Sequence, residues 1–213
     1  MKRLPLALLL ASSLFSPLPS HAQTAKTVPP NQPVHGLSQA EWSRAWWQWA
    51  ASFDQRASPV SDRTGALCAL KQSGPVWFLA GTYGTQRTIR SCKVPHGKYL
   101  FFPLINYVVA PHPDVPISCE EVTRSAAYRM ENASALILDV DGVRTPDLMS
   151  HRQATSQCFN LGERMDEKVS MFPSAANGYY VMLKPLSRGK HEINFGGALP
   201  NMLQAVTYTL EVE

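Results

Sequence analysis

The sequence predicts a mainly β protein with two helices (the α+β class), built as an antiparallel β-sandwich in a single domain. Short apolar runs separated by glycine and proline predict about eight or nine strands. Two capping-box sequences, each followed by an amphipathic stretch, predict the two helices. Four cysteines predict disulfides that hold the domain together. We expect one helix to pack on the sandwich near the N-terminus and the other to be inserted between strands.

Residues 1–22 have the layout of a secretory signal peptide. Basic residues at 2–3 precede an apolar stretch over 4–15 that is too short to span a bilayer, and small residues stand at 20 and 22. We therefore expect cleavage after Ala22 and a periplasmic or extracellular location in a bacterium.

Composition excludes several classes of function. The chain of 213 residues carries 20 Lys and Arg against 16 Asp and Glu. This balance predicts neither a nucleic-acid footprint nor a polybasic membrane patch. After the leader no apolar run approaches the roughly 20 residues of a membrane helix. We expect no nucleic-acid partner and no membrane insertion once the signal is removed.

In an oxidising compartment, an even number of cysteines favours disulfides. Three pairings of Cys68, Cys92, Cys119 and Cys158 are possible. We favour Cys68–Cys92 and Cys119–Cys158, because these pairs close the two short, sequential loops. Metal ligation is the weaker alternative, since no two cysteines have the spacing of a zinc knuckle. A reactive thiol at Cys119, just inside a helix start, is another.

The N-terminal part of the mature chain divides into a lead-in and a helix. Residues 23–36 are proline-rich and are expected to be flexible, and residues 37–213 form the domain. The capping box of Ser38 and Glu41 opens a helix that runs to about Phe53.

Four of this helix's residues are tryptophans. Trp42, Trp46 and Trp49 recur at a spacing of three to four, so they are expected to pack the helix on the sheet. Trp47 lies about 140° from Trp42 around the helix. It is either covered by a loop or exposed for binding.

The stretch 99–105 is apolar without alternation, which predicts a strand covered on both faces. Pro103 predicts a bulge or bend there, because proline cannot donate to a sheet ladder. A second capping box opens a helix over 118–131. Asp141-Gly142 is a strong hairpin signal. Strands are also expected over 76–80, 88–92, 136–140, 179–183, 191–195 and 206–212.

Several stretches resemble a set of uncharacterised secreted bacterial proteins. The shared segments are WSRAWWQW over 42–49, GPVWFLAG over 74–81 and CKVPHGKYLFFPLIN over 92–106, followed by a glycine turn at 188–191. The resemblance spans most of the mature chain. It implies no activity, because none is attached to that set.

Polar side chains that could bind or react follow the long apolar strand. Asn106 ends it, and His112 and Asp114 stand in the next proline-rich loop. An imidazole beside a carboxylate can act as a base with its orienting group or supply two metal ligands. The alternative is that Asn106 binds backbone at a turn and that the loop is solvated.

A basic cluster is also conceivable. Arg90, together with Arg87 and Lys98, could bind an anionic ligand beside the Cys68–Cys92 bridge. The alternative is that these charges protect strand edges.

No nucleophile elbow, P-loop or dinucleotide motif occurs, so no cofactor and no resident metal are expected. We expect a non-enzymatic binding or structural module whose aromatic surface near Trp47 and Tyr83 takes a carbohydrate or a small apolar ligand. A hydrolase or metal-assisted enzyme using Asn106, His112 and Asp114 is the alternative. A metal carrier using His96, His112 and methionines is a third possibility.

Overall fold

The computed structural model describes residues 27–213, apart from 84–85 and 168. The expected signal peptide, residues 1–22, lies outside the described residues. The elements are α1 (Gln39–Ala51), η1 (Gln55–Ala57), β1 (Val76–Phe78), β2 (Thr88–Val94), β3 (Tyr99–Val109), α2 (Cys119–Arg129), β4 (Ser134–Val140), β5 (Val143–Arg144), η2 (Leu148–His151), β6 (Arg152–Ala154), η3 (Leu161–Arg164), β7 (Ala175–Leu183), β8 (Gly189–Leu199) and β9 (Met202–Val212). The predicted mainly β fold with two α-helices is confirmed.

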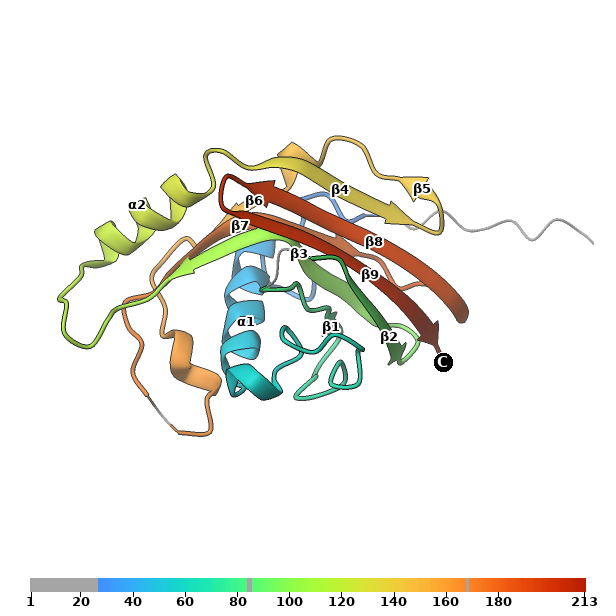
Figure 1. Ribbon diagram of the computed structural model, residues 1–213, viewed down its shortest axis with the longest axis horizontal. Coiled ribbons are helices and arrows are strands. Elements are labelled where there is room, and N and C mark those ends of the chain that lie inside the picture. Colours follow the sequence, from blue (N-terminus) through green and yellow to red (C-terminus); the bar gives the residue numbers. More distant parts are fainter. Residues whose placement is uncertain (1–26, 84–85, 168) are drawn as a thin grey trace, which may run out of the picture.

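The strands form two sheets (Figure 1). One has the order β1-β3-β7-β6 and the other the order β2-β9-β8-β4-β5. Two edge pairs, β1 with β3 and β2 with β9, are parallel, so the expectation of an antiparallel arrangement is wrong at these edges. After β1 the chain crosses to the other sheet, where it forms β2, and then returns as β3. Neither parallel pair is therefore linked by a hairpin, which only antiparallel neighbours can share.

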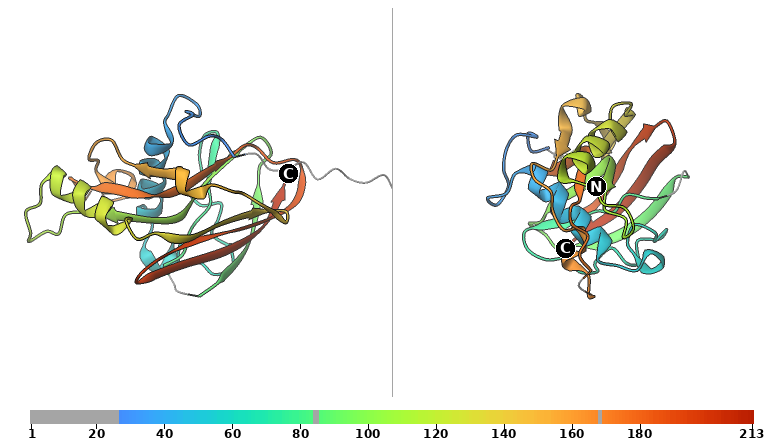
Figure 2. Two further views of the ribbon diagram at one scale, coloured as in Figure 1. Left: turned by 90° about the horizontal axis from the view of Figure 1, so that it is seen from above. Right: turned by 90° about the vertical axis from the view of Figure 1, so that its left-hand side faces the viewer.

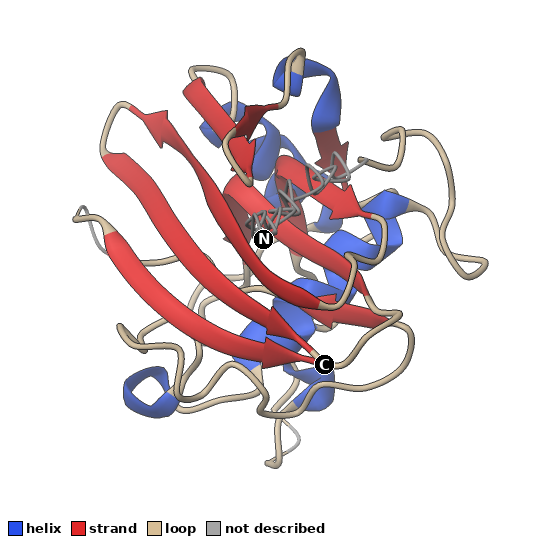
Figure 3. Ribbon diagram, turned by 90° about the vertical axis from the view of Figure 1, so that its right-hand side faces the viewer, coloured by secondary structure: helices blue, strands red, loops and turns tan. Residues whose placement is uncertain are grey.

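The two sheets face each other across one hydrophobic core (Figure 2). Alternate residues of both sheets point inward, and the Phe102 ring lies 4.5 Å from the Phe195 ring across the interface. Along β2 of the larger sheet, buried and exposed residues alternate, so the face of β2 that points away from the core is exposed. Figure 3 shows the strands of this larger sheet side by side, with helices beyond them.

Helix α1 covers the outer face of the four-stranded sheet. The capping box of Ser38 and Glu41 is present, as predicted. Trp46 and Trp49 are buried against Phe78, Phe101 and other residues of that face, which confirms their packing role. Because α1 covers one face of the sheet and the second sheet covers the other, all nine residues of β7 are buried.

The predicted irregularity at Pro103 is a β-bulge that changes which side chains face α1. Pro103 pairs with Tyr180 and Ile105 with Tyr179, so Leu104 is the extra residue. Without the bulge, Asn106 would point into the core between the sheets, because neighbouring side chains alternate. With it, Asn106 lies on the α1 side, where its amide meets the Tyr180 hydroxyl.

Gln204 of β9 fastens this bulge to the larger sheet. Its Nε2 donates to the carbonyls of Pro103 at 2.6 Å and Leu104 at 2.9 Å, and its Oε1 accepts from the backbone N–H of Thr82. Gly81 permits this arrangement, since a Cβ there would lie 2.2 Å from Gln204 Oε1. One buried amide therefore satisfies the backbone groups that the bulge removes from the ladder.

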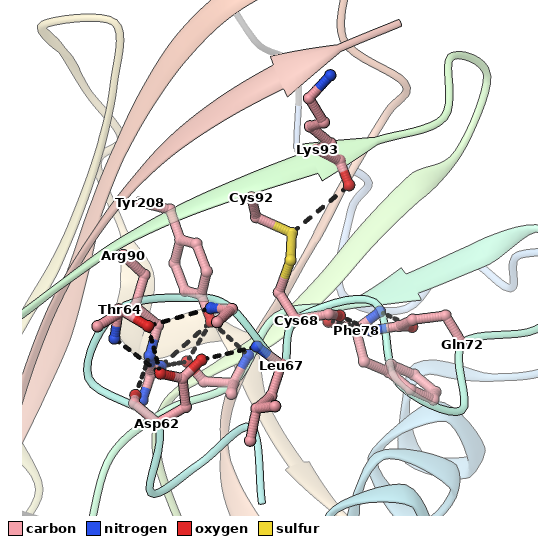
Figure 4. Close-up of a disulfide and its surroundings, with 12 residues drawn as sticks. Asp62, Thr64, Leu67, Cys68, Gln72, Phe78, Arg90, Cys92, Lys93 and Tyr208 are labelled. Carbon is pink, nitrogen blue, oxygen red and sulfur yellow. Dashed lines mark hydrogen bonds between the residues drawn. A yellow bond between two sulfur atoms is a disulfide. The ribbon is translucent and has the colours of Figure 1, made fainter.

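Both predicted disulfides are confirmed. Cys68–Cys92 ties the loop before β1 to β2, as Figure 4 shows, and Cys119–Cys158 ties the start of α2 to the loop before η3. The predicted helix over 118–131 is α2, which follows its capping box and lies at one end of the molecule. Each bridge closes a loop that a flexible unfolded chain would leave open.

Two local predictions have different outcomes. The Asp141-Gly142 hairpin is confirmed, with φ of 53° and 80° at its two turn residues. The flexible lead-in was predicted over residues 23–36, of which 23–26 lie outside the described residues. Residues 27–36 instead pack on the domain: Val28 is buried and donates its N–H to Met182 O at 2.8 Å. Val34 is buried as well, so two apolar side chains anchor this proline-rich segment.

Within the described ranges, no helix is long and apolar enough to cross a membrane.

Candidate functional site

A pocket of about 350 Å³ opens where α1 meets the end of β3 and the start of β9. We call it the inner pocket. Its walls are formed by Trp46, Trp47 and Ala51 of α1, by residues 55, 60 and 81–83 of two loops, by residues 106–108 of β3, and by Leu161, Met202 and Gln204. Most of these side chains are apolar or aromatic. The volume lies at the small end of the range for small-molecule sites, about 300–1,000 Å³.

Two of the lining residues, Trp47 and Asn106, belong to a hydrogen-bonded group of three side chains whose third member is Tyr180. The hydroxyl of Tyr180 accepts from Trp47 Nε1 at 2.9 Å and from Asn106 Nδ2 at 3.1 Å. Complete burial raises the pKa of the Tyr180 phenol above its ordinary value, although the two hydrogen bonds act in the opposite direction. The hydroxyl therefore stays protonated and neutral, and it holds both donors in fixed orientations.

One acceptor in this group, the side-chain oxygen of Asn106, has no hydrogen-bond partner among the described residues. Asn106 is only 8% exposed and lines the inner pocket, and its Oδ1 accepts no hydrogen bond from any residue that the structure describes. Gly178, opposite it on β7, makes room for it, because a Cβ there would lie 2.5 Å from Asn106 Cβ. The bulge, the glycine and Tyr180 together hold Asn106 in the lining of the pocket, with its amide oxygen available to a ligand.

Two of the predicted aromatic residues meet at this pocket. Trp47 is half-buried, with its ring edge-to-face against Trp46 at 5.1 Å. Tyr83 is 53% exposed and lies at the pocket's outer rim. The structure thus brings Trp47, Tyr83 and Asn106 together, although they come from three separate segments of the chain.

Arg90, in contrast, is not placed to bind a ligand, and the expectation of an exposed basic cluster is wrong for it. Arg90 is 1% exposed. Figure 4 shows its side chain beside Asp62 and Tyr208. Its guanidinium donates to the carbonyls of Asp62, Val60, Ala80 and Gly81 and to the Tyr208 hydroxyl. Arg90 is therefore a positioning residue, because Val60 and Gly81 line the inner pocket.

The Asp62 carboxylate interacts electrostatically with Arg90. Burial raises the pKa of Asp62, but backbone N–H groups of Leu67 and Thr64, the Thr64 hydroxyl and the Arg90 charge together hold it below its ordinary value. Asp62 thus stays ionised, caps the loop that it belongs to and balances part of the buried positive charge.

The three residues proposed for catalysis do not come together. Asn106 lines the inner pocket, whereas His112 and Asp114 do not. These two pair with each other, with Nδ1 3.7 Å from Oδ2, and their side chains are 70% and 87% exposed. They form a solvated pair in the loop before α2, which no other described side chain completes into a site.

A second polar cluster was not predicted from the sequence. His191 Nδ1 lies 2.7 Å from Asp141 Oδ2, and its Nε2 lies 3.3 Å from the Ser187 hydroxyl. This order of carboxylate, imidazole and hydroxyl is that of a hydrolytic triad. However, Nε2 is closer to the Ser187 carbonyl, at 3.0 Å, which is a pure acceptor. A nitrogen that donates to this carbonyl cannot accept the serine proton, so the cluster fastens two turns together.

A hollow of about 390 Å³ lies on the solvent side of the larger sheet. We prefer the inner pocket as the candidate site, because the Arg87 guanidinium in this hollow is already bonded to Thr207 and Asn194. Its exposed apolar residues, such as Ile137 and Leu203, lie on an open strand surface. In the described part of the chain, no group of three or more His, Cys, Asp or Glu side chains could hold a metal ion.

Comparisons with known proteins add little. No family model matches the chain, and no curated protein matches it. Among solved structures, the solution structure of amebosin aligns with 60% of this chain and 96% of its own, at 9% identity and a TM-score of 0.22. A likeness at this level carries no argument. The fold and the pocket define the protein only as a disulfide-bonded, mainly β domain with an apolar pocket beneath its first helix.

Proposed function

We propose that this protein is a secreted binding protein that takes a small, largely apolar ligand into the inner pocket. Small-molecule sites combine apolar walls with a few polar groups that orient the ligand. The observation that carries the proposal is Asn106 Oδ1, which accepts no hydrogen bond from the described residues and belongs to a side chain that Tyr180 positions. Asn106 lines the pocket together with Trp46, Trp47 and Leu161. A ligand that donates one hydrogen bond to this oxygen would satisfy it.

A small apolar ligand suits the pocket better than a carbohydrate. A sugar carries many hydroxyl groups, and each needs a partner when it leaves water. The indole N–H of Trp47 is already bonded to Tyr180, and the amide of Gln204 is bonded at both ends. Few polar groups therefore remain for a sugar.

The proposed location is the periplasm or the extracellular space. The two disulfides, Cys68–Cys92 and Cys119–Cys158, support an oxidising compartment. The leader at residues 1–22 and the resemblance to secreted bacterial proteins support the same location.

Calorimetric titration tests the binding proposal with two matched probes. 1-Naphthol can donate a hydrogen bond to Asn106 Oδ1, and 1-methoxynaphthalene cannot. We expect both to bind and the naphthol to bind about tenfold more tightly, since an acceptor left unpaired on burial costs about 1–3 kcal/mol.

A pair of variants locates the binding. Ala51→Phe fills the inner pocket from α1 and should abolish binding of both probes, whereas Ala69→Phe adds the same side chain at an exposed loop position outside the pocket. Unchanged near-ultraviolet circular dichroism shows that each variant is folded. Absence of binding by the parent protein, or equal binding by Ala51→Phe, would contradict the proposal.

A further inference from the structure

We propose that the natural ligand is an organic anion, whose apolar body fills the inner pocket while its carboxylate reaches Arg63 outside it. This inference rests on the proposed function and adds to it the charge of the ligand. It follows from a second hollow, from the absence of acidic residues among those that line the two hollows, and from the position of two arginines.

The second hollow, which we call the outer hollow, adjoins the inner pocket. It has a volume of about 540 Å³. Four lining residues belong to both: Gln55, Val60, Thr82 and Tyr83. The two spaces therefore meet along the loops that carry these residues. A ligand longer than the inner pocket would extend past Tyr83 into the outer hollow.

The two spaces differ in chemistry. The inner pocket has mainly apolar walls, and the outer hollow adds Ser61, Arg63, Gln86 and Thr88. A molecule that lies across both would thus need an apolar body and a polar end. This amphipathic character narrows the proposed ligand beyond what the inner pocket alone requires.

Charge decides the nature of the polar end. Among the described residues that line either space, Arg63 alone carries a full charge at neutral pH, and none is acidic. The Arg63 guanidinium makes no hydrogen bond or ion pair with any residue in the described ranges, and the residue is exposed. A planar guanidinium with all its donors available matches the two oxygens of a carboxylate.

A second positive charge lies behind the shared wall. Arg90 donates to the carbonyls of Val60 and Gly81, two residues that line the inner pocket. It is buried, so water screens its charge less than that of an exposed arginine. The Asp62 carboxylate offsets one of the two arginine charges, so Arg63, Arg90 and Asp62 together leave a net positive charge. The field at the site therefore favours an anion over a cation.

Indole-3-propionate and indole-3-propionamide are suitable probes. Each has an indole N–H for Asn106 Oδ1 and an apolar ring for the inner pocket, and they differ in the charge at the far end. Binding is followed in two-dimensional ¹⁵N NMR spectra of the labelled full mature chain. We expect the carboxylate to bind about fivefold more tightly than the amide in 20 mM salt, as for a partly solvated charge-assisted hydrogen bond. The difference should shrink in 500 mM salt.

Arg63→Gln is expected to remove the preference for the carboxylate and to leave the affinity for the amide unchanged. Arg188→Gln is the matched control, since Arg188 is exposed and lines neither space. It should keep the full preference.

The outcomes separate the two proposals. Equal binding of both probes by the parent protein, or a carboxylate preference that survives Arg63→Gln, overturns the anion proposal and leaves the pocket proposal standing. If neither probe shifts the resonances of Trp47 or Asn106, the proposed function itself is overturned.

Discussion

Replacing Arg90 by methionine tests how the loops around the inner pocket are held. The guanidinium makes five hydrogen bonds, four to backbone carbonyls and one to Tyr208. Methionine is also unbranched, reaches about as far as the arginine Nε and has no donor, so these buried acceptors would lose their partner. A buried polar group left unpaired costs about 1–3 kcal/mol.

The total cost is smaller than the cost per acceptor multiplied by five. The variant no longer has to bury a charge, and the loops can relax around the smaller side chain. We therefore expect Arg90→Met to lower the free energy of unfolding by about 3–5 kcal/mol. Arg90→Lys should recover only part of this, because one ammonium group cannot reach carbonyls on both loops.

Urea denaturation with both disulfides intact measures the effect. With a slope of about 2 kcal/mol/M, the midpoint of Arg90→Met should fall by about 2 M. Arg188→Met serves as the control, since Arg188 is exposed, and it should stay within about 0.5 kcal/mol of the parent protein. A loss below about 1 kcal/mol in Arg90→Met would refute the view that this side chain holds the loops.

Three further predictions concern other buried groups. Gln204→Leu leaves two carbonyls of the bulge without donors and should cost about 2–4 kcal/mol by urea denaturation; a neutral effect would contradict the role given to Gln204. Gly178→Ala places a Cβ 2.5 Å from Asn106 Cβ, so it should cost about 1–3 kcal/mol and also weaken 1-naphthol binding, and unchanged affinity would count against it. Burial lowers the pKa of His151 below its ordinary value. The unfolded chain therefore binds more protons than the folded protein as pH falls below about 6.5, and stability should decrease there; a slope that is the same in His151→Gln would exclude this cause.

Local signals in the sequence predicted the features that depend on neighbouring residues. The capping boxes at Ser38 and Ser118 mark both helix starts. Asp141-Gly142 marks a hairpin and Pro103 marks a bulge. Each follows from the conformational preference of a few residues, so no knowledge of the tertiary structure was needed.

The burial of Arg90 could have been predicted from the same kind of signal. Arg90, Cys92 and Val94 stand two residues apart on β2 and share one face of the strand. The predicted bridge to Cys68 requires Cys92 to point toward the body of the domain, and Arg90 must point the same way because it shares that face. The charge of Arg90 instead favoured a basic cluster or a protected strand edge, and neither agrees with its burial.

The pocket itself depends on contacts that no local pattern encodes. Trp47 and Tyr180 are 133 residues apart, and Asn106 and Tyr180 are 74 apart. The sequence identified Trp47, Tyr83 and Asn106 as separate candidates. It could not predict that they meet, because this depends on the pairing of β3 with β7 and on the placement of α1. The parallel edge pairs escaped prediction for the same reason.

The most direct test of the binding site is the response of individual side-chain N–H groups to 1-naphthol. Nitrogen-15 NMR resolves the indole signals of the five tryptophans and the side-chain amide of Asn106. We expect the indole of Trp47 and the amide of Asn106 to shift with saturation, while the indole of Trp77, buried between the sheets, stays in place. Saturable binding that leaves Trp47 and Asn106 unmoved would contradict the assignment of the ligand to this pocket.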